Sequence, residues 1–78
     1  MSKIPRISGN SMIRYLIKKG FVITHRNGSH ARLVKNHMYT SVPAGNKTMK
    51  IGLQLSVLED AMIAKEEFVN DHRDKIIK

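Results

Sequence analysis

Apolar residues recur at helical spacing near the start of the chain. They are Met12, Ile13, Leu16 and Ile17, and they fall on one face of a helix. Ser8 is a suitable N-cap because its hydroxyl can accept a hydrogen bond from an amide of the first turn. Gly20 can adopt the left-handed conformation that ends a helix. The pattern therefore predicts a helix over about residues 9–19.

After Gly20 the pattern is typical of strands, with β-branched, aromatic and alternating residues. Three runs are separated by turn residues, and they are 21–24, 29–35 and 38–42. Asn27-Gly28 is a strong hairpin signal, and Asn36-His37 is a second turn candidate. Pro43 ends the third run. We expect an antiparallel meander followed by a loop over 44–48.

Helical spacing returns at Met49, and it places four apolar residues on one side of a second helix. These are Ile51, Leu55, Leu58 and Met62, with Val57 and Ala61 adjoining. A further turn near 64–68 brings Phe68 back to the core, and 69–78 is a mixed-charge helical tail. Met12, Met49 and Met62 are expected to fill the core.

The predicted order is α-β-β-β-α, with a possible further helix, and the fold class is α+β. Residues 1–78 are expected to form one domain with a core over about 6–69 and a charged tail over 70–78. Both helices should cover one face of the three-stranded sheet. The other face is then available for binding.

The first hairpin allows two registers. With Asn27-Gly28 as a two-residue turn, His25 lies opposite His30, and both share a face with Ile23 and Arg32. Their β-carbons would then lie within about 5.5 Å. The other face, with Val22, Thr24, Ala31 and Leu33, would be buried beneath the helices. A three-residue loop with a bulge would instead place His30 opposite Thr24.

Charge is divided unevenly along the chain. The net charge is +8, residues 1–58 contain no Asp or Glu, and all six acidic residues lie in 59–78. This favours a polyanionic partner, with nucleic acid first, although charge alone does not separate RNA, DNA and an acidic protein. The chain has no Cys, no apolar run long enough to span a bilayer and no signal-peptide pattern. A cytoplasmic protein without a membrane partner is expected.

His30 is the candidate catalytic residue. Cleavage of RNA through its 2′-hydroxyl needs a base, an acid and positive charge at the phosphorane, and His can serve as either base or acid near neutrality. His25 is a possible second acid or base. Ser29 could donate to a phosphate oxygen, and the candidate phosphate-binding cations are Arg26, Arg32, Lys47 and Lys50.

No metal or other cofactor is expected. Magnesium-dependent nuclease sites are built from carboxylates, which the first 58 residues lack, and the spacing of the four His matches no usual zinc pattern. Three functions remain open from the residues: a nuclease, an RNA-binding module of the same fold that does not cleave, and a domain that docks an acidic protein.

Several short motifs in this order resemble the HicA family of toxin–antitoxin systems over about residues 6–69. They are Ser8-Gly9, Gly20-Phe21, Gly28-Ser29-His30, Val42-Pro43, Lys50, Gly52-Leu53 and Glu66-Glu67-Phe68. Many members have Gly where this chain has Met62, so the second helix is expected to run longer here.

The resemblance implies an mRNA interferase with a fold like the double-stranded RNA-binding domain. It also implies that His30, in the Gly-Ser-His motif, is the active histidine. The implied partners are mRNA and a HicB-type antitoxin, which covers the site and is typically acidic on its contacting surface.

Overall fold

The predicted order of helices and strands is confirmed. The structure is a computed structural model that describes residues 4–73, so part of the predicted tail, 74–78, lies outside the described residues. The elements are α1 (Gly9–Lys18), β1 (Val22–Asn27), β2 (His30–Lys35), β3 (Met38–Pro43), α2 (Ile51–Asp60) and α3 (Lys65–Arg73). The strands form one antiparallel sheet in the order β1-β2-β3.

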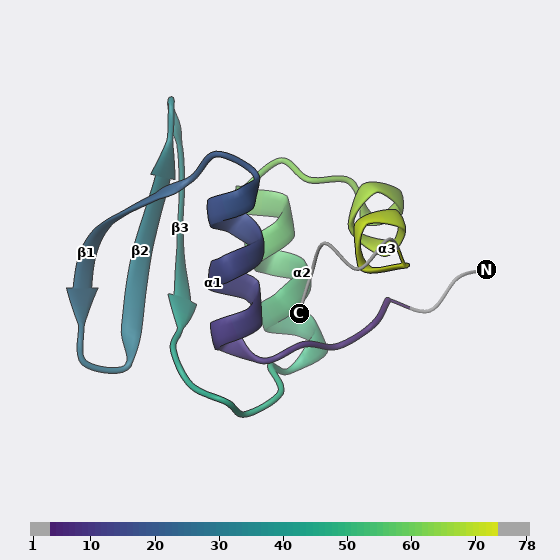
Figure 1. Ribbon diagram of the computed structural model, residues 1–78, viewed down its shortest axis with the longest axis horizontal. Helices are drawn as coiled ribbons and strands as arrows, with labels where there is room; N and C mark the ends of the chain where they lie inside the picture. Colours follow the sequence, from purple (N-terminus) through teal and green to yellow (C-terminus); the bar gives the residue numbers. More distant parts are fainter. Residues whose placement is uncertain (1–3, 74–78) are drawn as a thin grey trace.

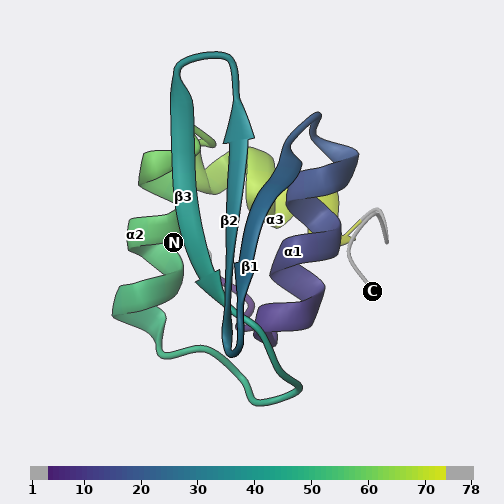
Figure 2. The same cartoon turned by 90° about the vertical axis from the view of Figure 1, so that its left-hand side faces the viewer.

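The molecule is layered. Figure 1 shows the sheet edge-on, with α1 and α2 packed against one face and α3 on the far side of these helices. Figure 2 looks onto the other face of the sheet, which no described helix covers; α1 lies behind the β1 side and α2 beside β3. This uncovered face is called the open face below. The prediction that the helices pack on one face is therefore confirmed.

The ends of α1 follow the predicted signals. Ser8 is the N-cap, and its hydroxyl accepts a hydrogen bond from the Ser11 amide at 3.1 Å. Gly20, with φ 103°, adopts the left-handed conformation just after the helix. At its first turn, α1 packs tightly against the end of β3, because a β-carbon on Gly9 would lie only 1.7 Å from the Pro43 carbonyl oxygen.

Replacing Gly9 with Ala is expected to lower the free energy of unfolding by about 1–3 kcal/mol, because backbone must move to admit the methyl group. Gly52→Ala is the matched control, since a β-carbon on this helical glycine meets no atom within 4 Å. That variant should be up to about 1 kcal/mol more stable than the wild type. Urea denaturation measures both, and equal stabilities would contradict the close packing.

The predicted register of the first hairpin is wrong. Gly28 and Ser29 form the two-residue turn, and Asn27 is the last residue of β1 rather than a central turn residue. Only Gly28, with φ 55°, has a positive φ in this turn, as a type II′ turn requires. His30 therefore lies opposite Asn27, and not opposite His25 or Thr24.

An irregularity between Ile23 and His25 corrects the predicted faces of β1. Thr24 is the extra residue there, so Ile23 pairs with Leu33 and falls on the helix side of the sheet. Ala31 and Leu33 are fully buried as predicted. The predicted burial of Val22 and Thr24 is wrong. The irregularity places Val22 opposite Val34 on the open face, and no residue of β1 is buried.

The second helix differs from its predicted pattern at both ends. Val57, Leu58 and Ala61 are buried, but Ile51 is 43% exposed. The helix ends at Asp60 and does not run longer; Met62 follows in the left-handed conformation and is 78% exposed. The prediction that Met62 fills the core is therefore wrong, whereas Met12 and Met49 are buried as expected.

A buried polar side chain of α2 binds the segment that precedes α1. Gln54 is fully buried, and its oxygen accepts a hydrogen bond from the Ile7 amide at 3.0 Å. Its side-chain nitrogen donates to the Pro5 carbonyl at 2.7 Å. The oxygen and the nitrogen of the Gln54 side chain thus each have a hydrogen-bond partner, which removes most of the cost of burying them.

The third helix docks on α1 through Tyr15 and Phe68. Both are fully buried, and their rings meet edge to face at 5.4 Å between centroids, which confirms the return of Phe68 to the core. Beside them, the Tyr15 hydroxyl donates to Asp71 at 2.8 Å, and Lys19 pairs with Asp71 at 2.7 Å and with Glu67 at 2.6 Å.

This polar cluster favours the charged form of Asp71. Burial opposes ionisation of Asp71, but the hydrogen bonds from Lys19 and Tyr15 outweigh it and lower the pKa of the carboxyl group. The hydrogen bonds to Asp71 and Glu67 raise the pKa of Lys19. Burial and the bond to Asp71 raise the pKa of the Tyr15 hydroxyl far above its usual value.

Candidate nucleic-acid interface

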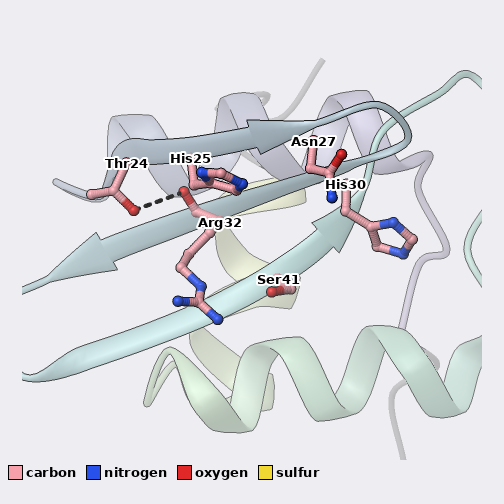
Figure 3. Close-up of a pocket in the computed structure, with 6 residues that line it drawn as sticks. All are labelled: Thr24, His25, Asn27, His30, Arg32 and Ser41. Carbon is pink, nitrogen blue, oxygen red and sulfur yellow. Dashed lines mark hydrogen bonds between the residues drawn. The ribbon is translucent and has the colours of Figure 1, made fainter.

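A shallow hollow of about 530 Å³ lies on the open face, at the end of the sheet nearest the β1–β2 turn. Figure 3 shows the six side chains that line it, which come from all three strands. They are Thr24, His25, Asn27, His30, Arg32 and Ser41. The predicted sharing of one face by His25, His30 and Arg32 is therefore confirmed.

His30 begins β2, where the turn holds it at the rim of the hollow. It lies between Asn27 on β1 and Pro43 on β3, and its side chain is exposed. The ring is held by its neighbour, because Ser29 Oγ lies 3.2 Å from His30 Nδ1. The Gly28-Ser29 turn is itself fixed to the end of β3, because the Ala44 amide donates a hydrogen bond to the Ser29 carbonyl at 2.6 Å.

This contact suits an acid or a base equally well. A hydroxyl can donate or accept, so it can accept from Nδ1–H and leave Nε2 as a base, or donate to Nδ1 and leave Nε2–H as an acid. Within residues 4–73, no hydrogen bond to His30 Nε2 occurs. Nε2 is therefore the atom of this ring that is available to a substrate.

His25 and Arg32 form the next row of the hollow. They lie opposite each other on β1 and β2, and Ser41 continues the row on β3. Thr24 at the bulge donates to the Arg32 carbonyl at 3.5 Å. His25 is diagonal to His30, so the two α-carbons are about 7–8 Å apart, further than in the predicted pairing.

The structure does not bring the other predicted cations into the hollow. Arg26 alternates with His25 and Asn27, and so points to the opposite side of the edge strand. Lys47 and Lys50 are exposed on the segment between β3 and α2 and do not line the hollow. That Arg26, Lys47 and Lys50 contact phosphates of a bound RNA outside the hollow remains a prediction.

Sequence reasoning missed three lining residues, which are Thr24, Asn27 as a side chain of the open face, and Ser41. It also missed Tyr39, which is 62% exposed on β3. The Arg32 guanidinium lies over its ring, 5.3 Å from the centroid. The Asn36-His37 turn carries the signal for both β3 residues, because a two-residue turn there places Ser41 opposite Arg32, as observed.

The charge around the hollow is positive. No acidic residue occurs on β1, β2 or β3. Among the described residues, no group of three His, Asp or Glu side chains is placed to hold a metal ion. The lining of the hollow offers imidazole, guanidinium, hydroxyl and amide groups. These groups can bind phosphate, and the imidazoles can transfer protons.

A protein-family model described as "HicA toxin of bacterial toxin-antitoxin" matches residues 9–63. The chain belongs to the HicA toxin family. The match covers α1, the whole sheet and α2, including the hollow around His30, and ends before α3. Comparison with curated proteins and with solved structures finds no significant match.

Membership of the HicA family makes this chain the toxin of a toxin–antitoxin pair, so an antitoxin partner is implied. None of the helices within residues 4–73 is long and apolar enough to cross a membrane.

Proposed function

We propose that this HicA toxin is an mRNA interferase, an endoribonuclease that needs no metal ion and acts in the cytoplasm. The observation that carries the proposal is the meeting of His30, His25 and Arg32 in one hollow on an acid-free sheet face. A base, an acid and a phosphate-binding cation are the groups that cleavage through the 2′-hydroxyl requires.

In this mechanism His30 exchanges a proton with the ribose-phosphate through Nε2. Acting as base, it removes the 2′-hydroxyl proton; the 2′-oxygen then attacks phosphorus and the bond to the 5′-oxygen breaks. A second group protonates the leaving oxygen, and His25 is the candidate because it lines the same hollow. The products are a 2′,3′-cyclic phosphate and a 5′-hydroxyl end. The two histidines can exchange these roles.

Arg32 is proposed to neutralise the phosphorane. Its guanidinium can donate two hydrogen bonds to phosphate oxygens, which is the geometry that Arg favours. Ser29 orients the His30 ring and can also donate to phosphate. Arg26, Lys47 and Lys50 lie outside the hollow and are proposed to contact phosphates further along the strand.

A HicB-type antitoxin is proposed to cover the open face. An acidic contacting surface would complement Arg32, His25 and His30 and would exclude RNA from the hollow. Thr24, His25 and Asn27 of the edge strand β1 line the hollow, so a protein that covers the hollow would also contact β1.

The decisive experiment is incubation of a synthetic RNA with the protein in EDTA. We expect cleavage with a cyclic phosphate end, and no cleavage of the same oligonucleotide when the ribose at the cut site is 2′-deoxy. Loss of activity in EDTA, or cleavage of the 2′-deoxy substrate, would contradict the mechanism. Tight binding that leaves all RNA intact would favour the alternative, a non-catalytic RNA-binding module.

A further inference from the structure

We propose that Tyr39 is a base-stacking site that makes single-stranded RNA the substrate of this toxin. The inference rests on the proposed function and extends it, because it names the form of RNA that the open face binds. The residue lies outside the hollow around His30, and no step of the cleavage mechanism uses it.

The position of Tyr39 is the first argument. It pairs with Val34 and precedes Ser41, two residues further along β3, so it stands on the open face in line with the hollow. It is 62% exposed, so most of this large aromatic side chain remains accessible to a ligand. An aromatic ring displayed on a sheet face is the arrangement with which single-stranded RNA-binding modules stack bases.

The neighbouring charge is the second argument. The Arg32 guanidinium lies 5.3 Å from the Tyr39 ring centroid, so the phosphate-binding cation and the ring form one unit. With most of the residue exposed, the cation covers only part of the ring. A base can stack on the ring while Arg32 contacts the adjacent phosphate. The strands themselves carry no acidic residue. Asp60 at the end of α2 lines a second hollow with Tyr39, so the RNA backbone is expected to follow the Arg32 side of the ring and not the α2 side.

The need for an unpaired base follows from geometry. Bases in an A-form duplex are stacked on one another and offer only their edges in the grooves, so none can lie flat on an exposed ring. Tyr39 is four residues from Pro43, the partner of His30, which corresponds to about 13 Å along the strand. The stacked base therefore belongs to a nucleotide near the cleaved bond but not at it.

The direct test uses fluorescence, because the chain contains no Trp. Tyr39→Trp, combined with His30→Ala to prevent cleavage, is titrated with a single-stranded RNA and with a duplex of the same composition. We expect the single strand to quench the indole and the duplex to leave it unchanged. Ile17→Trp in the same background is the control, since Ile17 is 45% exposed on α1, away from the open face.

Binding and kinetics give an independent readout. Tyr39→Ala is expected to weaken single-strand binding about tenfold, within the range of roughly 5- to 150-fold that base stacking contributes, while Tyr39→Phe retains it. In the cleavage-competent protein, Tyr39→Ala should raise KM and leave kcat nearly unchanged, because stacking is equal in the ground and transition states. Circular dichroism checks that this exposed substitution leaves the fold intact.

The proposal is overturned if saturating single-stranded RNA leaves the indole fluorescence of the Tyr39→Trp variant unchanged, or if Tyr39→Ala binds as the wild type does. Quenching by an acidic antitoxin and by no RNA would assign the ring to the protein partner instead. These results are distinct from failure of the proposed function, in which the wild-type protein binds the single strand through Tyr39 and never cleaves it.

Discussion

Alanine in place of His30 is expected to reduce the rate of RNA cleavage by about 10²–10⁴-fold, the contribution of a positioned acid or base. The side chain is exposed, and its described polar contact is with Ser29, so its removal should leave the fold unchanged. RNA binding should be reduced much less than cleavage, because Arg32 and the rest of the open face remain. Gel assays of RNA integrity, paired with filter binding at one salt concentration, measure the two effects separately.

His37→Ala is the matched control for this variant. His37 is also exposed and lies in the β2–β3 turn, outside the hollow around His30. Its replacement should leave cleavage unchanged, whereas His25→Ala should lower it to an intermediate extent if His25 is the second proton-transfer group. Full activity in His30→Ala would remove the basis of the proposed mechanism.

Phe68→Ala is expected to lower the free energy of unfolding by about 3–5 kcal/mol, the cost of deleting a large buried aromatic ring. Phe68 is fully buried on α3 and packs edge to face on Tyr15 of α1. The expected loss is a large part of the total stability of so small a domain, which is of the order of 5–10 kcal/mol. Urea denaturation followed by circular dichroism should show a folded state that is marginal at room temperature.

Glu66→Ala separates the ring's contribution from a general effect on α3. Glu66 is exposed in the first turn of the same helix, so the free energy of unfolding should change by no more than about 0.5 kcal/mol. The outcome that contradicts the prediction is a similar small change in both variants. It would mean that α3 is not part of the cooperative unit, although it completes the cover over Tyr15.

The helices and strands could be predicted because their signals are local. Ser8 and Gly20 mark the ends of α1, and the change from helical to alternating spacing marks the sheet. The hairpin register could not, because Asn27-Gly28 and Gly28-Ser29 are both acceptable turns and the bulge at Thr24 has no sequence signal. The faces of the histidines were nevertheless predicted correctly, since the true register differs by two residues and only an odd shift exchanges the faces.

The remaining errors come from interactions between distant parts of the chain. Gln54 is buried because Ile7 and Pro5 satisfy its amide, a pairing that the spacing of apolar residues cannot reveal. Met62 continues the apolar spacing of α2, yet the helix has already ended and the side chain is exposed. At the candidate site, chemistry identified His30, His25 and Arg32, whereas the cross-strand neighbours Ser41 and Tyr39 depended on register.

Because β1 buries no side chain, it can change its sequence at little cost to folding. Thr24 and Asn27 are therefore not constrained by packing, while Ala31 and Leu33 on the neighbouring strand are buried. His25 is constrained instead by its proposed role in proton transfer. Under the proposed function, RNA preference and the fit of an antitoxin to the open face can then change by single substitutions along one edge of the molecule.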